Sequence, residues 1–151
     1  MLTASQIADG VRRGTLSPAE AVQQHLELIG SLDARFEAWV LVDSAGARTA
    51  GRELEAKASL QGLLAGVPVG VKDIYDVAGL PTRCGSSGFA AYTPAEDAAT
   101  VQRVRAAGAV LLGKTATTEF AFLDPAPTRN PWNPTHTRSR LSVRIDAQVR
   151  L

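Results

Sequence analysis

Two short apolar segments restrict the fold of this chain more than any other feature. In residues 67–71, three valines alternate with Pro68 and Gly70, which is the period of a β-strand. The proline predicts a strand start or an edge, and the small residues on that face allow another backbone to come close. The second segment, Ala109–Leu112, predicts a short buried strand directly after a helix that Gly108 terminates. A helix, a glycine and a strand form half of a crossover unit, so we expect an α/β fold.

Three capping-box patterns, in which Ser or Thr is followed three residues later by Glu or Gln, predict helix starts. The expected helices run over residues 3–13, from 17 to a stop at about Gly30, and over 93–107. Residues 39–42 predict a buried strand, and the polar segment 44–58 predicts a further helix.

Composition excludes several classes of protein. With 151 residues, of which 45% are hydrophobic, the chain suffices for one globular domain. Its net charge of +1 and its 5% of aromatic residues do not favour nucleic-acid or membrane binding. Cys84 is the single cysteine, which excludes a disulfide framework. There is no run of 18 apolar residues and no signal-peptide pattern, so we expect a cytoplasmic protein.

The charge is unevenly distributed along the chain. Residues 1–137 carry 12 Lys and Arg against 14 Asp and Glu, a net charge of −2. Residues 138–151 carry four Arg and one Asp, a net charge of +3, and contain neither glycine nor proline. One interpretation is an ordinary basic tail. The other is that residues 138–151 do not belong to the same protein design as residues 1–137.

The segment Gly108–Thr115 matches the phosphate-binding pattern G-x-x-x-x-G-K-[ST]. A phosphate loop needs a strand before it and a polar, flexible backbone. Here a predicted helix precedes the first glycine, and the four intervening residues are apolar. We therefore expect a helix end followed by a core strand, and we keep nucleotide binding as the alternative function.

Lys72 is the strongest chemical candidate. It ends the alternating apolar strand, and lysine is seldom placed there without a partner or a task. It can form a salt bridge with Asp73 or Asp76, or it can act as a general base. A general base must be neutral near pH 7, which requires its pKa to fall by about 3 units, roughly 4 kcal/mol.

Other polar candidates are weaker. The Gly/Ser loop Cys84–Gly88 can line a pocket, although such loops are typically turns. His25 and His136 have no metal-ligand partner at a useful spacing and complete no Ser-His-Asp set. We therefore expect neither a metal nor a cofactor.

Six blocks of the chain resemble the amidase signature family in their order. The segment Gly62–Asp73 is similar to the family pattern PLxGVPVxVKD. The other blocks are 76–82, 94–98, 105–110, 113–120 and 128–134. The resemblance covers residues 1–137 and implies the N-terminal part of the amidase signature fold, a mixed sheet flanked by helices.

The resemblance also implies a reaction. Members of the family hydrolyse or transfer a carboxamide with a Ser–cis-Ser–Lys triad, and they include small-molecule amidases and the A subunit of a glutamyl-tRNA amidotransferase. Lys72 matches the triad lysine, which acts as base on the nucleophile through the bridging serine.

The family pattern stops within this chain. In the family, a Gly/Ser-rich segment that contains the bridging serine comes next. In this chain, residues 138–151 stand in its place. Ser139 and Ser142 fall near the bridging position, but they lack the surrounding glycines, so we do not assign them this role. Since both triad serines are missing, we expect a truncated and inactive amidase, or else a partner-binding module. The family domain is about three times as long as this chain, so unpaired sheet edges are expected to drive self-association.

A reading-frame shift near codon 137 explains the abrupt change. Residues 138–145 can be written in codons that, read from the second base, give Gly-Arg-Gly-Ser-Ala-Ser-Gly, which is close to the family's Gly/Ser segment. We state this as a hypothesis that the gene sequence decides.

Overall fold

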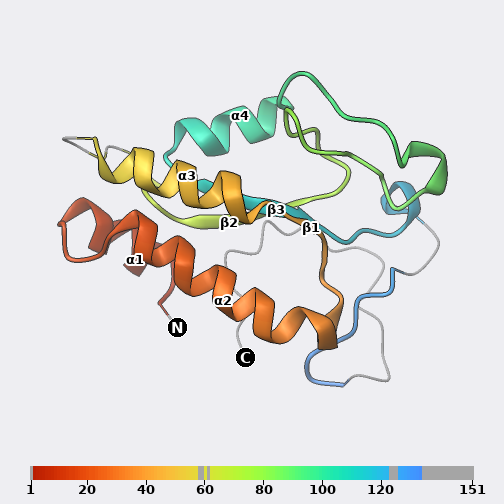
Figure 1. Ribbon diagram of the computed structural model, residues 1–151, viewed down its shortest axis with the longest axis horizontal. Helices are drawn as coiled ribbons and strands as arrows, with labels where there is room; N and C mark the ends of the chain where they lie inside the picture. The colour runs from red at the N-terminus through yellow and green to blue at the C-terminus, as the bar shows by residue number, and fades with distance from the viewer. Residues whose placement is uncertain (1, 58–59, 61, 123–125, 134–151) are drawn as a thin grey trace.

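A computed structural model describes residues 2–57, 60, 62–122 and 126–133 (Figure 1). The sequence expectations for the 138–151 tail and for His136 lie outside these residues. The helices and strands follow one another in this order: α1 (Ala4–Arg12), α2 (Pro18–Phe36), β1 (Trp39–Val42), α3 (Ser44–Glu55), β2 (Pro68–Lys72), the 3₁₀ turn η1 (Ser87–Phe89), α4 (Ala99–Ala106), β3 (Val110–Thr115) and the 3₁₀ turn η2 (Glu119–Ala121).

The strands form a mixed sheet in the order β1-β3-β2. β3 pairs antiparallel with β1 and parallel with β2, which confirms the expected α/β class. Gly113, which has φ +146°, lets β1 come close, because a Cβ there would lie 2.1 Å from the carbonyl oxygen of Leu41. Within the described residues, β2 has β3 as its only strand partner and leaves its other edge open. Pro68 is the first residue of β2, as its missing N–H predicts.

The helices cover both faces of the sheet. Because side chains alternate along a strand, neighbouring residues of β3 belong to different apolar clusters. Leu111 packs with α1, α4 and the three valines of residues 67–71, whereas Val110 and Leu112 pack with α2 and α3. The alternation predicted for residues 67–71 is therefore confirmed, and all three valines are buried.

Helix α2 is longer than the sequence predicts. Gly30 does not stop it; this residue is exposed and the helix continues to Phe36. An exposed glycine lowers helix stability by about 1 kcal/mol, which is too little to end a helix that continues to a buried phenylalanine. The end comes at Glu37, which adopts φ 50° and donates its N–H to the carbonyl oxygen of Asp33. The side chain of Asp33 also accepts from the N–H groups of Ala38 and Trp39, so the turn into β1 is fixed.

Helix α4 begins later than the sequence predicts. Residues 93–98 are not helical, although Thr93 and Glu96 have the spacing of a capping box. The segment instead docks on the turn that follows β2. Asp97 accepts the N–H of Ala78 at 2.7 Å, and Gly79 donates to the carbonyl oxygen of Pro94 at 3.0 Å. These tertiary bonds outweigh a local start signal.

Two expectations for the strands need correction. The sequence predicts a buried strand over residues 39–42, but the four residues of β1 are all half-buried because this strand lies at an edge of the sheet. At Gly70, side chains come close rather than another backbone. A Cβ there would meet the Trp39 ring and the Thr115 methyl group, both at 2.8 Å.

The segment that matches the phosphate-binding pattern is a helix end followed by a strand, as predicted. Gly108 has φ +93° just after α4, and Val110–Thr115 form the central strand. Its lysine, Lys114, is fully buried, so its ammonium does not face a ligand in solvent.

The continuation of α2 through Gly30 predicts the sign of a substitution. Gly30→Ala meets no atom within 4 Å, so we expect it to raise the free energy of unfolding by about 0.5–1 kcal/mol. Gly14, which has φ +70° and equally open surroundings, is the matched control, and Gly14→Ala should lower stability. Urea unfolding at one protein concentration measures both. A loss of stability in Gly30→Ala would show that α2 ends at this glycine.

Candidate active site at the carboxyl end of β2

Lys72 is the last residue of β2 and is half-buried. It pairs in register with Thr115 at the end of β3. Neither Asp73 nor Asp76 forms the salt bridge that the sequence allowed. Within the described part of the chain, the Lys72 ammonium makes no ion pair and no hydrogen bond. The candidate base therefore ends a buried strand without a carboxylate partner.

The backbone around Lys72 is fixed. Its carbonyl oxygen accepts the N–H groups of Ile74 at 2.8 Å and Tyr75 at 3.0 Å, which makes a tight turn directly after the strand. Asp73 donates its N–H to the carbonyl oxygen of Thr115 at 3.0 Å. The register of β2 on β3 thus continues one residue past Lys72.

Asp73 pairs instead with Lys114. The Lys114 Nζ lies 2.8 Å from Asp73 Oδ1, and the side chains are 0% and 1% exposed. Oδ1 takes part in this ionic contact but in no regular hydrogen bond among the described residues. Removing one partner of such a buried pair costs about 3–5 kcal/mol, because the other charge is left uncompensated.

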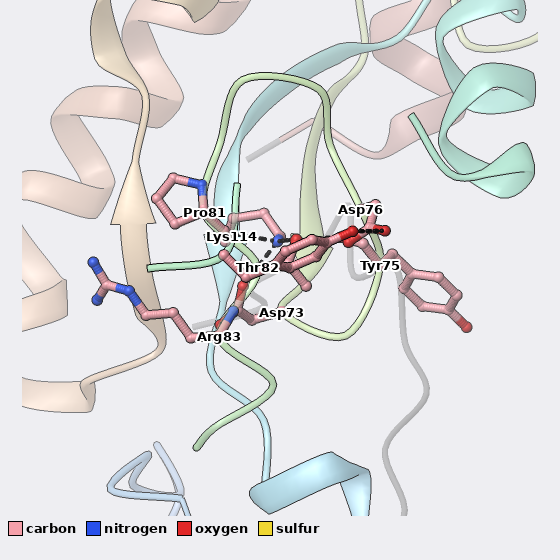
Figure 2. Close-up of polar contacts among 8 residues, drawn as sticks. Asp73, Tyr75, Asp76, Pro81, Thr82, Arg83 and Lys114 are labelled. Atoms are coloured by element: carbon pink, nitrogen blue, oxygen red, sulfur yellow. Dashed lines mark hydrogen bonds and ion pairs between the residues drawn. The ribbon is translucent and has the colours of Figure 1, made fainter. Parts of the chain in front are cut away.

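The remaining donors and acceptors of the pair bind one short segment (Figure 2). Lys114 donates to the carbonyl oxygen of Pro81 at 3.1 Å and to Thr82 Oγ1 at 2.8 Å. Asp73 Oδ2 accepts the N–H of Arg83 at 3.2 Å, and its carbonyl oxygen accepts the N–H of Cys84 at 2.9 Å. The ammonium thus makes two hydrogen bonds and one ionic contact, and a buried lysine charge requires such partners. We call Asp73, Lys114 and residues 81–84 the buried clamp.

Sequence reasoning missed the role of Lys114. The available signal was a lysine two positions after the last apolar residue of a predicted core strand, Leu112. A lysine is almost never fully buried without a partner, so this placement indicates an opposite charge nearby. The partner itself could not be identified, because Asp73 is 41 positions away along the chain.

Asp76 has a different task. Its Oδ2 accepts the hydroxyl of Tyr92 at 3.1 Å, and its carbonyl oxygen accepts the N–H of Ala98 at 2.9 Å. The hydrogen bond to the Asp76 carboxylate raises the pKa of the Tyr92 phenol. Asp76 therefore joins the segments before and after the 3₁₀ turn η1 rather than serving Lys72.

The Cys84–Gly88 loop is a turn that also lines a groove. Cys84 has φ +53°, and burial raises the pKa of its thiol, with a further rise from the Asp73 charge that Lys114 partly offsets. Gly85 and Ser87 line a groove of about 700 Å³ together with Thr117 and other residues. The segments after β2 and β3 gather at this end of the sheet (Figure 1, green and blue), where the rings of Phe89 and Phe120 are 5.5 Å apart.

The described residues contain no group of three His, Cys, Asp or Glu side chains that could hold a metal ion. The Nδ1 of His25 bonds the carbonyl oxygen of Ala21 at 2.7 Å within α2. Across the described residues, no helix is both long enough and apolar enough to span a membrane.

Sequence comparisons find one family. A family model described as Amidase matches residues 20–138. The A subunit of the glutamyl-tRNA(Gln) amidotransferase of Salinispora arenicola is 43% identical over 141 residues, covering 87% of this chain and 29% of that protein. The putative amidase AmiD of Mycobacterium tuberculosis is 39% identical over 142 residues, covering 89% of this chain and 30% of that protein.

A solved structure agrees with these relatives. The native peptide amidase from Stenotrophomonas maltophilia superposes with a TM-score of 0.82 at 28% identity. The match covers 89% of this chain and 31% of the peptide amidase. The chain thus spans less than a third of the length of the proteins that it matches.

Proposed function

Because the chain belongs to the amidase signature family, we propose that residues 1–137 are the N-terminal part of an enzyme that hydrolyses or transfers a carboxamide. The observation that carries the proposal is the placement of Lys72, which ends a buried strand with no carboxylate partner in the described chain. A general base must be free of a carboxylate partner, because an ammonium in a salt bridge is held in its charged form.

In the proposed reaction, the neutral amine of Lys72 takes a proton from a nucleophilic serine through a bridging serine. The serine oxygen attacks the amide carbon, the C–N bond breaks, and the leaving nitrogen takes up a proton. Attack by water on the acyl-enzyme completes hydrolysis, and attack by an amine or ammonia completes transfer. Both serines lie beyond the family-like blocks of this chain, whose contribution is the lysine and the strand that positions it.

The proposed substrate is a small molecule that carries a carboxamide. The relatives include a peptide amidase and one component of a tRNA-linked amidotransferase, so the class of amide stays open. We propose a cytoplasmic protein that needs no metal or cofactor and makes no direct contact with membrane or nucleic acid. Nucleotide binding is not favoured, because Lys114 is buried against Asp73.

We propose further that the family-like part ends near residue 137 and that residues 138–151 arise from a frame shift. The family model, whose match ends at residue 138, supports this boundary. The 151 residues then hold one member of the triad, Lys72, and the two serines lie in the shifted frame.

This proposal predicts no amide turnover by the 151-residue chain, because Lys72 has no nucleophile to activate. Restoring the frame after codon 137 should yield an amidase that loses at least about a hundredfold in kcat on Lys72→Ala. Lys57→Ala, which removes an exposed lysine, is the matched control and should leave kcat unchanged. Release of ammonia or an aryl amine measures turnover. Hydrolysis by the 151-residue chain, or full activity of the restored Lys72→Ala variant, would contradict the proposal.

The open edge of β2 predicts that the isolated chain associates with itself. The backbone N–H and C=O groups at this edge have no strand partner among the described residues, and such groups can pair with a strand of another chain. Light scattering at tens of micromolar should report a mass above that of one chain, rising with concentration. A clean monomer with a cooperative thermal transition would count against this expectation.

A further inference from the structure

We propose that Lys114 is a positioning residue for the amide reaction: by neutralising Asp73 in the protein interior, it keeps Lys72 free of a carboxylate partner. The inference rests on the proposed function, because it assigns a reason for the availability of the Lys72 amine. It adds a residue that touches neither substrate nor nucleophile and acts through its neighbour.

The sequence places an acidic residue directly after the candidate base. Asp73 is the residue directly after Lys72, so no acidic residue is closer to Lys72 along the chain. A carboxylate near an amine favours the charged ammonium, and an ammonium cannot take a proton from a nucleophile. An uncompensated Asp73 would therefore oppose the task proposed for Lys72.

The geometry of the buried clamp removes this conflict. Asp73 Oδ1 lies 2.8 Å from the Lys114 ammonium, and Oδ2 accepts the N–H of Arg83. Both carboxylate oxygens thus contact groups other than Lys72. The ammonium is held in turn by Pro81 and Thr82, so it cannot turn away from Asp73 without losing two hydrogen bonds.

Stability alone is a weak reason for such a pair. Replacing a buried ion pair by well-packed apolar residues is often neutral or stabilising, so an apolar pair would serve as well in a core. The proposed role explains why the pair includes Asp73, the residue next to the candidate base Lys72.

Competitive acetylation tests the inference on the full 151-residue chain. Only Lys57, Lys72 and Lys114 carry ε-amines, and Lys114 is buried, so the Lys72-to-Lys57 labelling ratio is a clean measure of neutral Lys72 amine. Lys114→Gln keeps an N–H donor for the clamp but removes the charge. We expect the ratio to fall by roughly tenfold, because an uncompensated carboxylate nearby favours the charged ammonium, which is not acetylated.

The double variant Lys114→Gln with Asp73→Asn is the matched control. It removes both charges, so the labelling ratio should return to that of the unmodified chain. A purely structural role predicts the opposite sign, because a loosened strand end exposes Lys72 and raises its labelling. An unchanged or increased ratio in folded Lys114→Gln overturns the inference, as does a double variant whose ratio stays low.

A measurement on the unmodified chain keeps the inference falsifiable if Lys114→Gln does not fold. Lysine side-chain NMR detects coupling across a hydrogen bond or ionic contact from an ammonium to a carboxylate carbon. We expect such coupling between Lys114 and Asp73; coupling between Lys72 and Asp73 overturns the inference. Neither readout depends on turnover, so both distinguish a failure of this inference from a failure of the proposed amide reaction.

Discussion

The ion pair between Lys114 and Asp73 is the interaction on which this end of the molecule depends. Lys114 belongs to the central strand β3, and Asp73 directly follows β2, so one contact of 2.8 Å joins the ends of two parallel strands. The same two side chains bind residues 81–83. Because both charges are buried, neither group can be removed alone without leaving an uncompensated charge.

The contacts of the buried clamp determine which carboxylates are available to pair with the Lys72 ammonium. Two carboxylates follow it within four positions, and in solution either could hold its ammonium. In the folded chain, Asp73 is committed to Lys114, and Asp76 binds Tyr92 and Ala98. The strand that bears Lys72 ends on the side of the sheet where the loops after β2 and β3 meet (Figure 1). Among the described residues, the amine of Lys72 has no hydrogen-bond or ion-pair partner. This placement supports the role proposed for Lys72 in an amide reaction.

Features coded by neighbouring residues could be predicted from the sequence, and features coded by distant residues could not. The capping box at Ser17 and the alternation of residues 67–71 act locally, and both predictions are confirmed. The predicted helix end at Gly30 and the predicted helix start at Thr93 were wrong, because tertiary packing decides where α2 ends and where α4 begins. The position of Lys72 at the end of its strand was predictable, and its role in a site stays a prediction. The pairing of Asp73 with Lys114 was not predictable, because no local pattern encodes that contact.

Amide hydrogen exchange at Arg83 and Cys84 tests the central claim most directly. Both N–H groups donate to Asp73, one to its side chain and one to its carbonyl oxygen, although they lie outside every helix and strand. If the buried pair fastens this segment to the sheet, these amides should exchange as slowly as that of Val110, which donates to Val67. Exchange at the rate of an unstructured peptide, while Val110 stays protected, would contradict the claim that the Lys114–Asp73 pair organises this end of the fold.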